Sequence, residues 1–125
     1  MGNNINIGSK VRIEGPVVIG SNCTIEERCT LSKGTVIGEG VHIGKGTNIQ
    51  SSIILDNRTV SSNSFLKRCI IDTNCYIGKN TSIEEGVVTG SNVEIGKNSI
   101  IRSSSTIKNG SIILPYSIID ADYAD

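Results

Sequence analysis

The chain has 125 residues, enough for one domain, and carries 12 basic and 12 acidic side chains. This balance excludes a nucleic-acid binder that works through a large net positive charge. The composition includes 22 Ile and 9 Val against 4 Leu and 2 Ala, with 14 Gly, 12 Asn and 16 Ser. Ile and Val favour strands, whereas Gly and Asn accept the backbone angles of tight turns. The composition therefore predicts an all-β chain with many turns and no long helix.

No segment of the chain is predicted to contact a membrane. The sequence has no run approaching the roughly 18 apolar residues that a membrane-spanning helix needs. Residues 1–9 lack the basic stretch and apolar run of a secretory signal peptide. We therefore expect a cytoplasmic protein whose partners include neither a membrane nor a nucleic acid.

An aliphatic residue recurs every six positions along almost the whole chain. The series runs from Ile7 to Leu55 and again from Ile71 to Ile119, with Thr89 as its one polar member. Val60 and Leu66 complete the series if two steps, Leu55 to Val60 and Leu66 to Ile71, shorten to five residues. The series then has twenty members, which predicts twenty short structural repeats.

The residues around this aliphatic position, here called i, follow a pattern of their own. Position i+3 is usually Asn or Gly, which enter the left-handed backbone region at low cost. Position i−2 is small or β-branched, and in a strand it points to the same side as i. Each repeat therefore predicts a short strand with two inward side chains, followed by a tight corner.

Six residues for a strand and a corner are too few for hairpins with an ordinary core. Three such repeats can instead form one triangular coil, and successive coils stack at about 4.8 Å, the spacing between strands in a sheet. The large residue at i fills the axis, and the small residue at i−2 lets the wall close around it. We expect a parallel β-solenoid of six to seven coils, in one domain over residues 1–125.

Repeats such as residues 36–41 (VIGEGV) and 42–47 (HIGKGT) resemble those of the hexapeptide-repeat proteins, which form left-handed parallel β-helices. The resemblance covers nearly the whole chain. It also implies the left hand of the coil, because β-crossovers in general are right-handed. The family contains acyltransferases, γ-type carbonic anhydrases and the C-terminal domains of sugar-phosphate nucleotidylyltransferases, so the chemistry of individual residues has to separate these functions.

The single histidine, His42, separates these functions in part. A γ-type carbonic anhydrase needs three His ligands on its metal, so we expect no such site, and no other metal or cofactor. Hexapeptide acyltransferases usually use a His as general base, and His42, at the outward position i−1, is the candidate catalytic residue. However, no carboxylate at a suitable spacing identifies itself as its orienting partner, and no long loop is available to wall an acyl-CoA site. A solvated surface histidine is the simpler interpretation.

The central segments resemble the C-terminal β-helix domains of glucose-1-phosphate or mannose-1-phosphate nucleotidylyltransferases. Residues 49–57 (IQSSIILDN) and 66–80 (LKRCIIDTNCYIGKN) look like the coil x-N-S-I-I-x-D-N of that family, with Ser51 where Asn is common. Residues 13–23 are similar to the start of such domains. The resemblance implies a parent enzyme that joins a sugar 1-phosphate to a nucleoside triphosphate and releases pyrophosphate. It also implies that this chain serves oligomerisation or regulation.

Nothing in the chain resembles the catalytic α/β domain of those enzymes. Residues 34–46 are rich in Gly, but these glycines fall at corner positions, and no helix N-terminus follows to hold a phosphate. The chain also begins inside the repeat, at Ile5 and Ile7, without a capping element. We therefore expect a parent protein that continues N-terminal to Met1, and a chain that by itself lacks the catalytic motif.

Four cysteines, Cys23, Cys29, Cys69 and Cys75, occupy the small inward position i−2. Each pair is spaced by six residues, unlike the shorter spacing of zinc ligands. We interpret all four as buried thiols in the slot that Val and Thr fill elsewhere. Free thiols of this kind fit a reducing cytoplasm.

One face of the predicted prism carries aliphatic residues at the outward position i−1 in five successive coils: Val18, Val36, Ile54, Ile70 and Val88. A contiguous apolar patch of this kind indicates an interface. We expect it to form a dimer or trimer, or to pack against an N-terminal catalytic domain. The register is least constrained between Asp56 and Ile71, where Arg58 falls at an inward position.

Three functions remain open at this point. The first is a C-terminal domain of a sugar-1-phosphate nucleotidylyltransferase, the second is an acyl-CoA-dependent acyltransferase with His42 as base, and the third is a non-catalytic assembly module. The sequence alone names neither the sugar nor the nucleotide.

Overall fold

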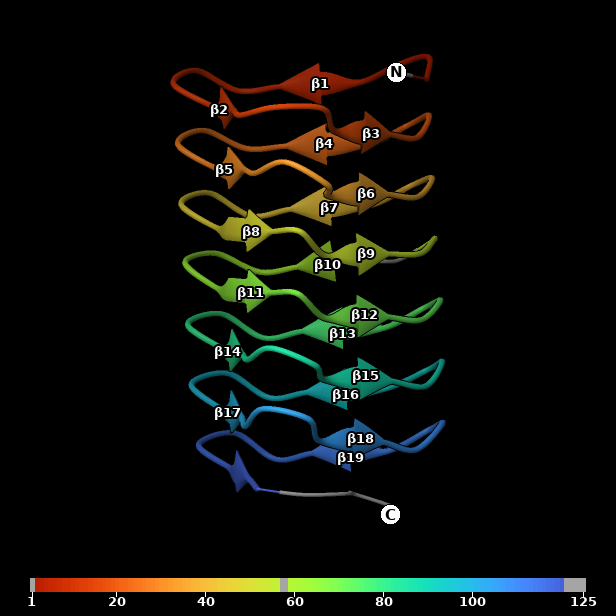
Figure 1. Cartoon of the computed structure of the whole chain (residues 1–125), viewed down its shortest axis with the longest axis vertical. Helices are drawn as coiled ribbons and strands as arrows, with labels where there is room; N and C mark the ends of the chain where they lie inside the picture. Colours follow the sequence, from red (N-terminus) through yellow and green to blue (C-terminus); the bar gives the residue numbers. More distant parts are fainter. Residues whose placement is uncertain (1, 57–58, 121–125) are drawn as a thin grey trace.

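A computed structural model describes residues 2–56 and 59–120, and these residues form a parallel β-solenoid of twenty short strands without a helix (Figure 1). The chain winds along one long axis, and the labelled strands β1 and β19 lie near its opposite ends (Figure 1). Three strands make one coil, so the twenty strands form six coils and two strands of a seventh. This confirms the predicted all-β, parallel coiled architecture.

Every third strand stacks, in parallel, in the same sheet. The first sheet contains β1 (Asn6–Ile7), β4 (Thr24–Ile25), β7 (His42–Ile43), β10 (Thr59–Val60), β13 (Tyr76–Ile77), β16 (Glu94–Ile95) and β19 (Ile112–Ile113). The second contains β2 (Arg12–Ile13), β5 (Thr30–Leu31), β8 (Asn48–Gln50), β11 (Phe65–Lys67), β14 (Ser82–Ile83), β17 (Ile100–Ile101) and β20 (Ile118–Ile119). The third contains β3 (Val18–Ile19), β6 (Val36–Ile37), β9 (Ile53–Ile54), β12 (Ile70–Ile71), β15 (Val88–Thr89) and β18 (Thr106–Ile107).

The core is a set of aliphatic columns that run along the solenoid axis. Strands pair in register, so that Ile25 lies against Ile7 on one side and Ile43 on the other. In every strand from β3 to β19, the second residue of the strand is buried, beginning with Ile19 and ending with Ile113. Full burial of one Ile side chain contributes about 1.5–3 kcal/mol, so these columns supply most of the driving force for folding.

Several polar side chains at the inward position i−2 contact a backbone carbonyl inside the wall. The hydroxyl of Thr47 donates to the carbonyl of Ser61 at 3.0 Å, and the hydroxyl of Ser64 donates to the carbonyl of Gly78 at 3.0 Å. The thiol of Cys29 makes the same kind of contact with the carbonyl of Gly44 at 3.0 Å. Because a buried polar group needs a partner, this contact explains why Ser, Thr and Cys all fit the position.

All four cysteines are free and buried, as predicted. Burial raises the pKa of the Cys69 thiol from 9.0 to about 11. Because the thiolate is the nucleophile, only about one Cys69 in a thousand is reactive at pH 8 in the folded state. In the unfolded chain the same thiol ionises near pH 9.0, so its contribution to stability is present below that pH and is lost as pH rises towards 11.

We expect native protein at pH 8 to resist alkylation at all four cysteines, and denatured protein to be labelled four times. Mass spectrometry after iodoacetamide treatment measures the number of labels. Rapid labelling of Cys23 or Cys75 without denaturant would show that position i−2 does not face inward.

The structure corrects the predicted register in one place. The first short step runs from Ile49 to Ile54, not from Leu55 to Val60, while the second short step from Leu66 to Ile71 is confirmed. Ile54, which we expected on the surface, is therefore fully buried at 0% exposure. Ile53 takes the outward position and is 38% exposed. The predicted inward residue Arg58 lies outside the described residues.

The two short corners lie against each other in neighbouring coils, which explains where they occur. Ser51 and Arg68 each turn a short corner in the left-handed region, with φ of 48° and 47°. The backbone N–H of Arg68 donates to the carbonyl of Gln50 at 2.8 Å, and Lys67 pairs with Gln50 in the extended ends of β11 and β8. Coils stacked in register must follow the same path, so a corner that shortens in one coil favours the same shortening in the next.

Candidate functional site

His42 lies on the outer surface of the first sheet, in β7. Its neighbours across the sheet are Thr24 in β4 and Thr59 in β10. The next residue, Ile43, points into the core, so His42 must point outwards. Its side chain is 43% exposed, which confirms the outward placement predicted from the repeat.

The structure pairs His42 with Glu26, against our expectation that no carboxylate orients it. Nε2 of His42 is hydrogen-bonded to Oε2 of Glu26. A carboxylate only accepts hydrogen bonds, so Nε2 carries a proton, and in the neutral imidazole Nδ1 is the basic nitrogen. Glu26 directly follows β4, the strand beneath β7, and precedes His42 by 16 residues. The coil length of 18 residues leads from His42 to Thr24 and not to Glu26, so the repeat alone does not indicate this pair.

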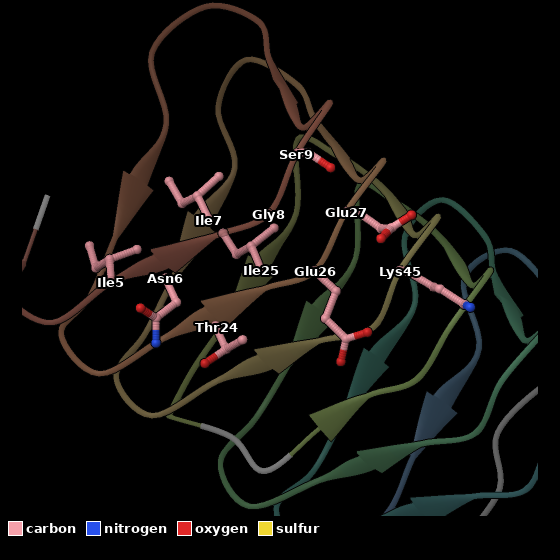
Figure 2. Close-up of a pocket in the computed structure, with 10 residues that line it drawn as sticks. All are labelled: Ile5, Asn6, Ile7, Gly8, Ser9, Thr24, Ile25, Glu26, Glu27 and Lys45. Carbon is pink, nitrogen blue, oxygen red and sulfur yellow. The ribbon is translucent and has the colours of Figure 1, made fainter.

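An open hollow of about 730 Å³ lies next to this pair, at the first coils of the solenoid (Figure 2). Figure 2 shows Ile5, Ile7 and Ile25 on one side of the ribbon, and Asn6, Thr24 and Glu26 on the other. The remaining lining residues are Gly8, Ser9, Glu27 and Lys45. The hollow therefore joins the apolar end of the core to a polar outer wall that contains two carboxylates.

The His42–Glu26 pair and the hollow beside it could supply a general base, but few other groups for catalysis. The basic Nδ1 of His42 is suited to take a proton from an alcohol or amine, and Glu26 fixes the ring that carries it. Lys45 is the one cation among the described residues that line the hollow. The sequence interpretation included His42 but missed Glu26, Glu27 and Lys45.

Residues 2–56 and 59–120 form neither a metal-binding cluster nor a membrane-spanning helix. Within these ranges, no three His, Cys, Asp or Glu side chains are grouped so that they could hold a metal ion. The same part of the chain has no helix with the length and hydropathy to span a bilayer.

The outer surface of the third sheet carries four of the five predicted interface residues, and the fifth position is held by a different residue from the one we predicted. Ile53 stands in place of Ile54, and strand pairing aligns the five side chains in one column. We call this column the apolar stripe: Val18, Val36, Ile53, Ile70 and Val88. Val18 is 58% exposed, Ile70 42% and Val88 41%, whereas Val36 is half-buried. The column ends at Thr106, which pairs with Val88.

Comparison with known proteins identifies the family. The family model described as the GMPPB C-terminal domain matches residues 13–124. The chain belongs to this family. It is thus a hexapeptide-repeat protein of the left-handed β-helix type, as the repeat and the resemblance implied. No curated protein matches the chain in sequence.

Several solved structures share the fold of this GMPPB C-terminal domain. A hexapeptide transferase family protein from Anaplasma phagocytophilum has a TM-score of 0.86 at 20% identity, over 94% of this chain and 74% of that one. An N-acyltransferase from Bacillus cereus, in complex with dTDP and coenzyme A, has a TM-score of 0.71 at 22% identity, over 82% and 75%. UDP-N-acetylglucosamine acyltransferase from Francisella novicida has a TM-score of 0.57 at 16% identity, over 93% and 52%. At these identities the likeness shows the fold alone.

Proposed function

We propose that the chain is the C-terminal β-helix domain of a sugar-1-phosphate nucleotidylyltransferase. Such an enzyme joins a sugar 1-phosphate to a nucleoside triphosphate and releases pyrophosphate. The observation that carries the proposal is the match of residues 13–124 to the GMPPB C-terminal domain. The four free, buried thiols support a cytoplasmic location.

In this proposal the domain is not catalytic, and it serves the assembly or regulation of its parent enzyme. The apolar stripe supports an assembly role, because a contiguous exposed apolar patch marks an interaction surface. Its partner is a second copy of the chain or an N-terminal catalytic domain. The polar hollow beside His42 supplies no helix N-terminus for a nucleotide phosphate among the described residues.

We expect the isolated chain to release no pyrophosphate from any nucleoside triphosphate and sugar 1-phosphate. A coupled pyrophosphate assay measures this release. Release above the enzyme-free rate would show that the chain holds a catalytic site of its own.

The reading frame upstream of Met1 tests the domain assignment separately, because a continuing frame with an alternating α/β pattern is expected there.

The second candidate function is that of an acyl-CoA-dependent acyltransferase, and the His42–Glu26 pair is the observation that favours it. We expect no release of coenzyme A when the chain is mixed with acetyl-CoA and amine or hydroxyl acceptors. Release that falls at least about 100-fold in His42→Ala would promote this second function over the first, since a general base contributes about 10²–10⁴-fold. Glu26→Gln would then reduce the rate and shift its pH profile.

A further inference from the structure

We propose that Asn109 is a site of spontaneous deamidation, which the folded solenoid protects and which local opening of the chain releases. Asn109–Gly110 is the single Asn–Gly pair in the sequence. It lies in the corner that joins β18 to β19, here called the β18–β19 corner, near the end of the solenoid opposite β1 (Figure 1). This inference does not depend on the function proposed above.

The reaction is a ring closure within the chain, and water is its only co-reactant. The backbone nitrogen of Gly110 attacks the side-chain carbonyl carbon of Asn109, and a C–N bond forms. The side-chain NH₂ group leaves with the amide proton of Gly110 as ammonia, which gives a succinimide. Water then opens the ring at one of its two carbonyl groups and leaves either aspartate or isoaspartate. Glycine favours this ring because it has no side chain to hinder the attack and accepts many backbone conformations.

One residue of the preceding coil holds both reacting groups. Ser91 donates its backbone N–H to Oδ1 of Asn109 at 2.9 Å, and its carbonyl accepts the N–H of Gly110 at 2.9 Å. The first bond fixes the side-chain carbonyl. The second bond keeps the proton on the attacking nitrogen and holds that nitrogen against the neighbouring coil. We therefore expect the ring to close only after the β18–β19 corner lifts from Ser91.

An aspartate makes the same side-chain contact at the same edge of the solenoid. In the corner that follows β9, Oδ1 of Asp56 accepts the backbone N–H of Glu39 at 2.8 Å. A glycine precedes the donor each time, and an added Cβ at Gly38 or Gly90 would overlap the accepting oxygen of Asp56 or Asn109. Aspartate therefore fits this position, and the aspartate product is expected to leave the corner intact.

Isoaspartate does not fit the corner. Its backbone runs through the former side chain, so one more atom separates Cα of position 109 from the nitrogen of Gly110. Gly110 has φ of 74°, and Asn74 and Asn92 at the same edge have 59° and 58°, so the corners follow one path. Coils stacked in register require this common path, and an extra atom displaces the Gly110 N–H from Ser91. Isoaspartate therefore prevents the corner from closing again.

Opening at one end of the solenoid is enough to release the site. Each coil contacts only its neighbours, so a solenoid can open from an end while the rest stays folded. The β18–β19 corner is followed by only two further strands in the described chain, β19 and β20. Deamidation of the native protein then proceeds at the rate of the unfolded chain multiplied by the fraction of molecules with this corner open. Each such event leaves a permanent chemical record of opening.

Peptide mapping by mass spectrometry measures deamidation at Asn109 in the full chain. At equal pH and temperature, we expect the native protein to react at least about tenfold more slowly than the protein in urea, because only open molecules react. Gly110→Asn is the matched control. Asn74 and Asn92 show that asparagine accepts this corner, and its side chain hinders ring closure. We expect Gly110→Asn to slow the reaction in urea and to leave the circular dichroism unchanged.

Ser91→Pro tests the contact with the preceding coil, because it removes the N–H that binds Oδ1 of Asn109. Pro115 holds the equivalent position of the corner between β19 and β20, so a corner of this solenoid accepts proline there. We expect native Ser91→Pro to deamidate at least about tenfold faster than the native parent, since a larger fraction is open. Circular dichroism confirms its fold, and the comparison of native and urea-treated parent does not depend on this variant.

The two products are compared through their resistance to urea. We expect Asn109→Asp to keep the parent's unfolding midpoint, and the purified isoaspartate form to unfold at a lower urea concentration. Three results overturn the inference. Equal rates in native and urea-treated protein would show that Ser91 protects nothing, and no reaction at Asn109 in urea would remove the site. An isoaspartate form as stable as Asn109→Asp would show that the corner accepts the extra backbone atom.

Discussion

Replacing Ile54 by glutamate is expected to unfold the solenoid, whereas the same replacement at Ile53 is expected to leave it folded. The Ile54 side chain is fully buried in the axial core, and the adjacent Ile53 points to solvent from the same strand. Loss of a buried Ile costs about 2–5 kcal/mol, and burial of an unpaired carboxylate adds several more. Together these costs match the entire stability of a typical domain, about 5–15 kcal/mol.

Far-ultraviolet circular dichroism and urea denaturation of the two variants measure this difference. Ile53→Glu is the matched control, because it introduces the same charge one residue away. The opposite result, a folded Ile54→Glu and an unfolded Ile53→Glu, would restore the register in which Leu55 is the inward residue. It would also remove Ile53 from the apolar stripe.

Gly78→Ala is expected to lower the free energy of unfolding by about 3 kcal/mol, near the upper end of the usual cost of overpacking. A Cβ atom at Gly78 would lie 2.5 Å from the backbone nitrogen of Lys97 in the next coil. The N–H of Gly78 also donates to the carbonyl of Ile95 at 2.7 Å, so the two coils cannot separate without losing this bond. The added methyl group therefore has to push apart backbone that the sheet holds together.

Gly40→Ala is the matched control. Gly40 has φ of 69°, but nothing lies within 4 Å of an added Cβ, so the substitution strains the backbone without a steric clash. Its expected cost is about 1–2 kcal/mol. Guanidinium chloride titration of the parent and both variants measures the difference. Equal losses at the two positions would mean that the close approach of the coils does not limit Gly78.

Most of the fold could be predicted from the sequence, because contacts in a solenoid repeat at a fixed distance along the chain. Each inward residue packs mainly against residues one coil before and one coil after it. A six-residue period in the sequence therefore becomes a column in space, as Ile25 and Ile43 show. Corner positions were equally predictable, since Asn22 and Gly40 adopt the left-handed φ that their residue types accept.

The position of the first short corner depended on the tertiary structure. Residues 53–55 are three consecutive aliphatic residues, so hydrophobicity alone is satisfied by either of two registers. The choice is made by stacking: the corner at Ser51 has to shorten where Arg68 shortens in the neighbouring coil, because the backbone hydrogen bonds between coils require matching paths. That constraint acts between segments about 17 residues apart and is invisible in a local pattern.

The candidate sites also combine features that the sequence predicts with features that only the tertiary structure decides. The outward positions of His42, Val18, Ile70 and Val88 followed from the period, because alternation along a strand decides which side chains face solvent. The pairing of His42 with Glu26 required the tertiary structure, since two flexible surface side chains meet only when neighbouring coils bring them together. The sequence by itself therefore determined which residues face inward and outward over most of the chain. Only the stacked coils decided which outward side chains touch.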